Sequence, residues 1–182
     1  MPANFIAATT RELRSLKRAA DRAISQLTDE QFFALLDPES NSIAVLVKHL
    51  AGNMRSRWTE FLTTDGEKPY RRRDDEFRIE AADTRAALLE RWEQGWKILQ
   101  GTLESLAPGD LERTVTIRSE PYTVLGAVQR SLSHYSDHIG QIILLAKHFA
   151  GAKWQTLSIP RGKSEEHNIA FAAKQKEKAG KV

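Results

Sequence analysis

The segment "TVLGAVQRSLSHYSDHIGQIILLAKHF", Thr123 to Phe149, decides the fold that this sequence predicts. Its apolar side chains recur at the period of a helix and form one broad stripe: Val124, Val128, Tyr135, Ile139, Ile142 and Ala146. His134 and His138 lie on one flank of that stripe, because four residues make just over one helical turn. We therefore expect a long helix that buries one face and holds two imidazoles between the core and the solvent.

Three other segments have the same periodicity, at about Asn4–Leu27, Ile43–Phe61 and Thr84–Leu106. Four amphipathic helices with little strand signal predict an all-α protein, a four-helix bundle. The connections after the second and third helices are long enough for crossovers. Thr114–Arg118 alternates and is β-branched, which predicts a short extended or hairpin piece. Ser164 is a candidate cap for a short last helix, which makes a C-terminal extension.

Length and composition indicate a single domain. Of 182 residues, 41% are hydrophobic and 28% are charged, which provides enough apolar surface for one core. We expect this domain to cover residues 1–168 and a basic tail to cover residues 169–182. The chain has no cysteine, which excludes disulfides, thiolate metal ligands and a cysteine nucleophile.

The N-terminal residues carry charges throughout and lack the apolar block of a signal peptide. The longest apolar runs, such as "IAVLV" and "IILLA", are far shorter than the ~20 residues that cross a bilayer. We therefore expect a soluble cytoplasmic protein that does not bind membranes.

The formal net charge is +3, and the basic excess lies mainly in Arg71–Arg73 and in the lysines of the C-terminal end. Basic clusters of this kind can bind phosphates of nucleic acid. However, no stacking aromatics are interleaved with the C-terminal lysines, and "RRR" is followed directly by "DDE". A solvated charge run is therefore the favoured interpretation, and nucleic acid is not an expected partner.

The five histidines are His49, His134, His138, His148 and His167. His49 lies at the margin of the apolar stripe of the second helix, so three imidazoles meet if the second and fourth helices are neighbours. Three neutral imidazoles suit Zn²⁺ or Ni²⁺ and leave a coordination position open. The alternative is that these histidines cap carbonyls or bond neighbouring side chains, and spacing leaves both open. We interpret His148 as a surface residue and His167 as a surface residue or, less favoured, part of a lid or an extra ligand.

Four other polar residues lie within about two turns of the histidines: Asn53, Arg57, Tyr135 and Gln141. Arg57 has the geometry to bind a carboxylate, but a surface salt bridge is the favoured interpretation. Tyr135 is expected to pack in the core. Asp137 is expected to be an exposed charge, or else an acceptor that supports a histidine of a partner subunit.

Four stretches of the sequence resemble the DinB-like superfamily. They are "LVKHLAGNMRSRW" in the second helix, "SHYSDHIGQI" in the last long helix, the closing "WQTLSIPRGKSEEHN", and "HLAGNMRSRWTEFLTTDGEKPYRRRDDEF". The resemblance extends to about Asn168 and is strongest to a subfamily without an assigned biochemical role. It implies a four-helix bundle, a homodimer, and a divalent metal whose three histidine ligands map onto His49, His134 and His138.

The resemblance also guides the functional hypothesis. Relatives include bacillithiol transferases and a mycothiol-dependent maleylpyruvate isomerase, which use the metal to bind and activate a low-molecular-weight thiol. We therefore expect a metal-dependent enzyme, either a thiol transferase of the bacillithiol, mycothiol or glutathione type or a hydrolase. The alternative is a non-catalytic homodimer that binds a metal or a small ligand.

Overall fold

The computed structural model describes residues 2–179, with side chains from 4 to 176. The chain forms two compact units, Met1–Gly151 and Ala152–Val182, and each is described by itself. The first contains α1 (Pro2–Ile24), α2 (Asp29–Phe33), α3 (Ile43–Trp58), α4 (Arg85–Ser105), α5 (Val124–Ala150), the strands β1 (Thr114–Ile117) and β2 (Glu120–Thr123), and the 3₁₀ turns η1 (Arg73–Phe77) and η2 (Pro108–Glu112). The second contains α6 (Ser164–Ala179), and η3 (Gly151–Lys153) begins at the last residue of the first unit. The described chain is thus mostly helical, as the sequence predicts.

Hydroxyl side chains cap the starts of four helices. Thr28, Ser42, Thr84 and Thr123 each accept a hydrogen bond from the backbone N–H three residues later. This satisfies a donor that a helix start would otherwise leave unpaired. The ends shift more: α3 stops at Trp58 rather than Phe61. Glu60 has a φ of 49°, which a continuing helix does not allow.

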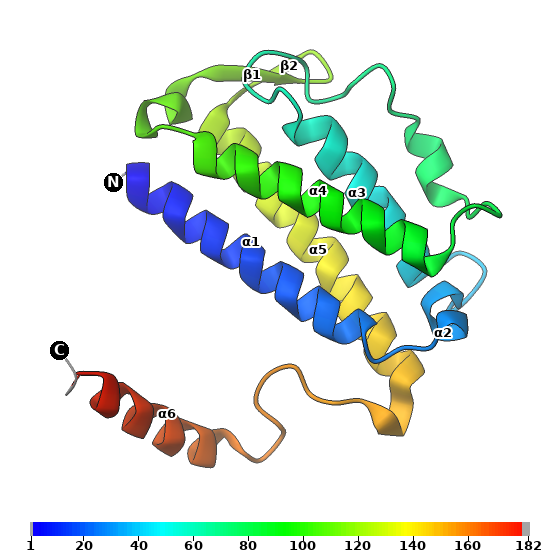
Figure 1. Ribbon diagram of the computed structural model, residues 1–182, viewed down its shortest axis with the longest axis vertical. Helices are drawn as coiled ribbons and strands as arrows, with labels where there is room; N and C mark the ends of the chain where they lie inside the picture. The colour runs from blue at the N-terminus through cyan, green and yellow to red at the C-terminus, as the bar shows by residue number, and fades with distance from the viewer. Residues whose placement is uncertain (1, 180–182) are drawn as a thin grey trace. The chain divides into compact units, whose positions relative to one another are not determined.

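The long helices of the first unit pack as two main pairs, α3 along α4 and α1 along α5 (Figure 1). Smaller contacts join α3 to α5 and α1 to α4. Large side chains such as Leu50, Trp92, Trp96 and Tyr135 are buried between them. Because α3 contacts α5, His49 and the HxxxH pair lie on neighbouring helices, which their spacing alone left open.

The predicted hairpin between α4 and α5 is confirmed. β1 and β2 pair antiparallel, with Thr114 opposite Thr123. Their two-residue turn, Arg118 and Ser119, has positive φ at both positions, 56° and 64°, as a type I′ turn requires. Asp65 accepts hydrogen bonds from both turn N–H groups at 2.9 and 2.7 Å. The loop after α3 therefore holds the turn in a conformation that non-glycine residues disfavour.

The connector between α3 and α4 differs from the solvated charge run that the sequence predicts. Arg72 and Asp74 are exposed, but the Arg71 side chain is only 3% exposed and Glu76 is buried. Burial is possible because Arg71 bonds both Glu67 and Glu76. The interpretation as a wholly solvated run is therefore wrong for Arg71 and Glu76.

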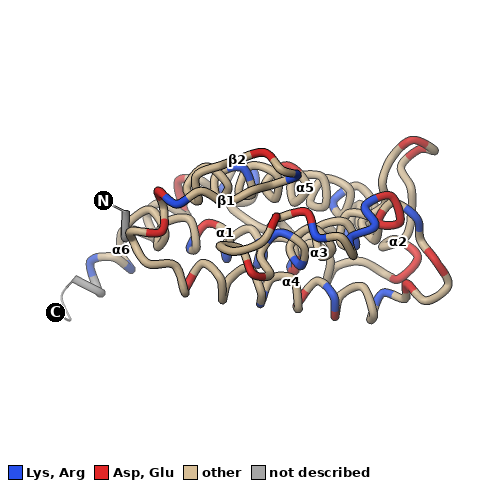
Figure 2. Tube along the Cα trace, turned by 90° about the horizontal axis from the view of Figure 1, so that it is seen from above, with Lys and Arg blue, Asp and Glu red and all other residues tan. Residues whose placement is uncertain are grey.

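Basic and acidic positions are interspersed along the first unit (Figure 2). Among the described helices, none combines the length and the apolar character needed to cross a membrane. The predicted last helix is present as α6, but Ser164 is its first helical residue rather than its cap, and α6 exposes His167. The limits predicted for the domain, 1–168, and the tail, 169–182, stay a prediction.

Candidate metal centre

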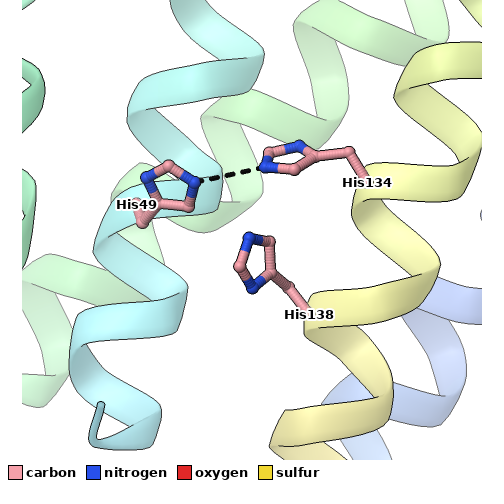
Figure 3. Close-up of side chains that lie close together, drawn as sticks. All are labelled: His49, His134 and His138. Carbon is pink, nitrogen blue, oxygen red and sulfur yellow. Dashed lines mark hydrogen bonds between the residues drawn. The ribbon is translucent and has the colours of Figure 1, made fainter. Parts of the chain in front are cut away.

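Three of the five histidines meet between α3 and α5. His49 comes from α3, and His134 and His138 come from successive turns of α5 (Figure 3). One ring nitrogen from each lies within 4.8 Å of the others. The Nε2 atoms of His49 and His134 are 3.3 Å apart. The ring centre of His138 lies 5.0 Å from that of His49 and 4.7 Å from that of His134. The three rings thus face one common space.

A carboxylate behind His49 orients its ring. Nδ1 of His49 lies 2.8 Å from Oε2 of Glu76, and Phe77 packs its ring 4.9 Å from the imidazole. Arg71 grips the same carboxylate with two bonds of 2.8 Å. Burial raises the pKa of Glu76, but the bonds from Arg71 and His49 outweigh this and lower it. The ionised carboxylate accepts a hydrogen bond from Nδ1–H of His49, so the Nε2 lone pair of His49 points toward His134.

Gly52 provides the space for this carboxylate. It lies three residues after His49, on the same side of α3, where Glu76 crosses the helix. A Cβ at Gly52 would lie 2.3 Å from Oε1 of Glu76. Sequence reasoning missed Glu76, and the only signal for it was a glycine inside a helical pattern, which usually has a packing reason.

The two histidines of α5 are neutral near pH 7. Burial, followed by the charges of His138, His49, Arg57 and Arg130, lowers the pKa of His134 to about 3. Burial also lowers the pKa of His138, although the bond to Gln141 opposes the shift. Gln141 Oε1 lies 3.2 Å from Nδ1 of His138. Both rings therefore carry a free lone pair at ordinary pH, which a metal ligand needs.

The donor set fits a borderline divalent ion. A tetrahedral zinc site with Zn–N bonds of 2.0–2.1 Å separates its ligand atoms by about 3.3 Å. The His49–His134 nitrogen separation, 3.3 Å, has that value. The group contains three imidazoles and neither a carboxylate nor a thiolate, which favours Zn²⁺ or Ni²⁺ over Mg²⁺ or Ca²⁺. These three histidines can therefore hold a metal ion.

The expectation that Tyr135 packs in the core is confirmed. Its side chain is fully buried, and its hydroxyl accepts a hydrogen bond from Trp58 Nε1 at 2.9 Å and donates one to Asn53 Oδ1 at 3.0 Å. Burial raises the pKa of Tyr135 to about 12 despite the bond from Trp58. The hydroxyl therefore stays protonated, and it fixes Asn53 next to the histidines.

Arg57 is not the surface salt bridge that the sequence favours. It is 4% exposed and makes no hydrogen bond or ion pair with the described side chains or backbone. Burial lowers the pKa of its guanidinium, and Arg130 and Arg71 add to this. Gly66 lies against Arg57 and presents only backbone there, while Tyr135 and Glu67 oppose the shift. The side chain lines the same cavity as the three histidines.

Three further residues named in the sequence analysis are not part of the three-histidine cluster. Asp137 is exposed, as expected, on the helix that carries His138. His148 is exposed near the end of α5, which confirms its interpretation as a surface residue. His167 belongs to α6 of the second unit, where its ring stacks on Phe171. Its part in a lid stays a prediction.

The sequence matches one family model over residues 1–163, described as "Protein of unknown function (DUF1572)". No curated protein matches the chain.

Proposed function

We propose that this chain, which belongs to the DUF1572 family, is a divalent-metal-dependent enzyme of the DinB-like superfamily. The observation that supports the proposal is the convergence of three imidazoles from two helices on one space. His49, His134 and His138 are the proposed ligands, and Zn²⁺ or Ni²⁺ is the proposed ion. Glu76 holds His49 in the tautomer that binds a metal through Nε2.

Three protein ligands leave room for a reactant. An ion held by these three histidines would supply Lewis acidity that activates water or a thiol. We favour thiol transfer over hydrolysis, because the superfamily relatives use low-molecular-weight thiols. The chain has no cysteine, so a bacillithiol-, mycothiol- or glutathione-type cosubstrate would supply the sulfur.

The fold and assembly proposed with this function are those of the superfamily. We take α1, α3, α4 and α5 as the four helices of a bundle with crossover connections, and a homodimer as the working assembly. Contacts of α3 with α4 and of α1 with α5 support the first point. Light scattering of the purified chain tests the second, because a dimer doubles the 20.6 kDa mass of the monomer.

Metal content of protein purified without an affinity tag tests the site. About one equivalent of zinc or nickel is expected in the wild type, as for a three-ligand site, and none in His134→Ala. His148→Ala is the matched control, because it removes an exposed histidine from the same helix, and it should keep the metal. Equal metal content in all three proteins, or none in the wild type, contradicts the proposal.

A rate measurement then distinguishes the proposed enzyme from a non-catalytic binding protein. An electrophile is incubated with bacillithiol, mycothiol or glutathione and the metal-loaded protein. A rate that disappears in His134→Ala and persists in His148→Ala supports a transferase. Bound metal without a rate on any of the three thiols favours the alternative, a non-catalytic metal- or ligand-binding homodimer.

A further inference from the structure

The cavity beside the three histidines has an unusual lining. It measures about 380 Å³, within the range of about 300–1,000 Å³ typical of small-molecule sites. Five arginines line it, from α3, the connector, the hairpin turn and α5: Arg57, Arg71, Arg73, Arg118 and Arg130. Neither aspartate nor glutamate is among its described lining residues. The cavity therefore joins the proposed metal ligands to a strongly basic wall.

We propose that this cavity binds an anionic substrate, whose carboxylate or phosphoryl oxygens pair with the guanidinium of Arg57. The inference rests on the proposed function, because it names the substrate class of the same site. The planar guanidinium presents paired N–H donors that match both oxyanions, whereas neutral substrates would leave its charge uncompensated.

Most of the five arginines already have a partner. Arg71 is bound by Glu67 and Glu76, and Arg118 contacts Glu67 at 3.3 Å. Arg73 lies over the ring of Phe77, and Arg130 lies over that of Tyr122. These contacts hold the four arginine side chains in position. The cavity wall stays positively charged, because two of the contacts are with neutral rings and Arg71 and Arg118 share Glu67.

Arg57 differs from the other four because it is both buried and unpaired. Its Nε is inaccessible to solvent and has no hydrogen-bond partner among the described residues. A buried cation without a counter-charge is costly, so a bound anion is the natural source of compensation. Compensation from the protein is limited: Arg130 and Arg71 add positive charge, and of the two groups that oppose them, Tyr135 is a phenol that stays protonated and Glu67 is a carboxylate.

The surroundings of Arg57 are built to hold it. A Cβ at Gly66 would lie 2.8 Å from Cδ and 2.9 Å from Nε of Arg57, so only glycine leaves this side chain its place. The carbonyl of Gly66 accepts a bond from Ser56, and its N–H donates to Thr116 of β1. The loop is thus fixed from two sides while the guanidinium stays free for a ligand.

Calorimetric titration of metal-free protein tests the proposal, with inorganic phosphate and succinate as probes at constant ionic strength. Removing the metal first prevents direct coordination of the anion. We expect saturable binding of at least one probe, and at least a tenfold rise in Kd in Arg57→Met. Arg57→Lys keeps the charge but not the paired donors, so it should bind more weakly than wild type and more tightly than Arg57→Met. The tighter probe identifies the preferred oxyanion.

Arg18→Met is the matched control, because it removes an exposed arginine of α1 that does not line the cavity. Its Kd should stay within twofold of wild type. No binding of either probe to wild type, an unchanged Kd in Arg57→Met, or an equal loss in Arg18→Met overturns the inference.

Metal content of the same proteins, measured as purified and before the metal is removed for the titration, keeps the two proposals apart. Arg57→Met should retain the zinc or nickel of wild type, since Arg57 is not a proposed ligand. Metal without Arg57-dependent anion binding refutes this inference alone. Arg57-dependent anion binding without any metal refutes the proposed function and leaves the anion site standing.

Discussion

Helix α3 contains two cationic side chains that are largely shielded from water, and the two differ in their partners. Near the start of the helix, Lys48 donates to Asp83 at 2.6 Å, and Arg91 reaches the same carboxylate at 2.8 Å. Near its end, Arg57 has no such partner within the described chain. The first arrangement is complete in the folded protein, whereas the second becomes complete only with a ligand. We therefore interpret an unpaired buried charge that faces a cavity as a ligand-binding residue, and a paired buried charge as one that stabilises the fold.

The largest expected effect comes from breaking the complete pair. Asp83→Ala leaves the largely buried Lys48 without its carboxylate and also removes the partner of Arg91. We expect a loss of about 3 kcal/mol in the free energy of unfolding, measured by urea denaturation. Asp74→Ala, in the same connector but 90% exposed, should change it by less than about 0.5 kcal/mol. Equal effects of the two substitutions would show that the Asp83 pair is not special.

The same measurement on the incomplete site should give the opposite sign. Arg57→Met keeps an unbranched side chain and removes a desolvated charge. We expect the metal-free, anion-free protein to gain about 1–2 kcal/mol in the free energy of unfolding, as when buried charges are replaced by apolar groups. A loss of more than about 1 kcal/mol would mean that the folded protein already compensates Arg57, and the contrast with Asp83 would disappear.

The carboxylate of Glu76 combines features of both sites. It is paired with Arg71, as Asp83 is with Lys48, and it also accepts a hydrogen bond from His49 of the proposed metal site. Gly52→Ala would place a methyl group in contact with it. Alanine normally stabilises a helix interior by about 0.5–1 kcal/mol relative to glycine. Here we expect a net loss of about 1–2 kcal/mol from overpacking. We also expect about tenfold weaker zinc binding, because His49 loses its acceptor.

A matched glycine tests the reason for that loss. Gly101 lies in α4, and the described atoms leave open space where its Cβ would be. Gly101→Ala should stabilise the protein by about 0.5–1 kcal/mol in the same urea titration, with unchanged zinc affinity in a chelator competition. A similar gain from Gly52→Ala would show that Glu76 moves aside at no cost.

The comparison also explains which parts were predictable from sequence. The starts of helices were predictable, because their signals act within a few residues. These signals are a capping hydroxyl, such as that of Ser42 or Thr84, and the apolar period that follows it. The meeting of His49 with the HxxxH pair required α3 to contact α5, and the family resemblance, rather than the spacing, implied this. Helix starts depend on neighbouring residues, and the meeting of the histidines depends on a fold that the whole family shares.

Glu76 and Arg57 were not predictable in this way. Glu76 lies 27 residues from His49 in a charged connector, and local sequence does not distinguish a buried carboxylate from its solvated neighbours. Arg57 follows the pattern of a surface cation at a helix end, where an acidic partner is the ordinary expectation. Its place depends on Gly66, which lies against it and is bonded to a hairpin more than fifty residues after Arg57. Only the two glycines, Gly52 and Gly66, signalled a close approach.

The last expected effect concerns Asp65, whose hydrogen bonds hold the hairpin turn that carries Arg118 of the cavity wall. Partial burial raises its pKa, but hydrogen bonds from the backbone N–H groups of Glu67, Ser119 and Arg118 outweigh this and lower it from 3.8 to about 2. Because the folded value is the lower one, the stabilisation is present above pH 3.8 and is lost as the pH falls toward 2. Asp65→Asn should therefore cost about 1 kcal/mol near pH 7, allowing for solvent screening, and progressively less below pH 4. Urea titrations at several pH values check this, and a cost that does not change with pH would mean that the shape of the Asp65 side chain, rather than its charge, holds the turn.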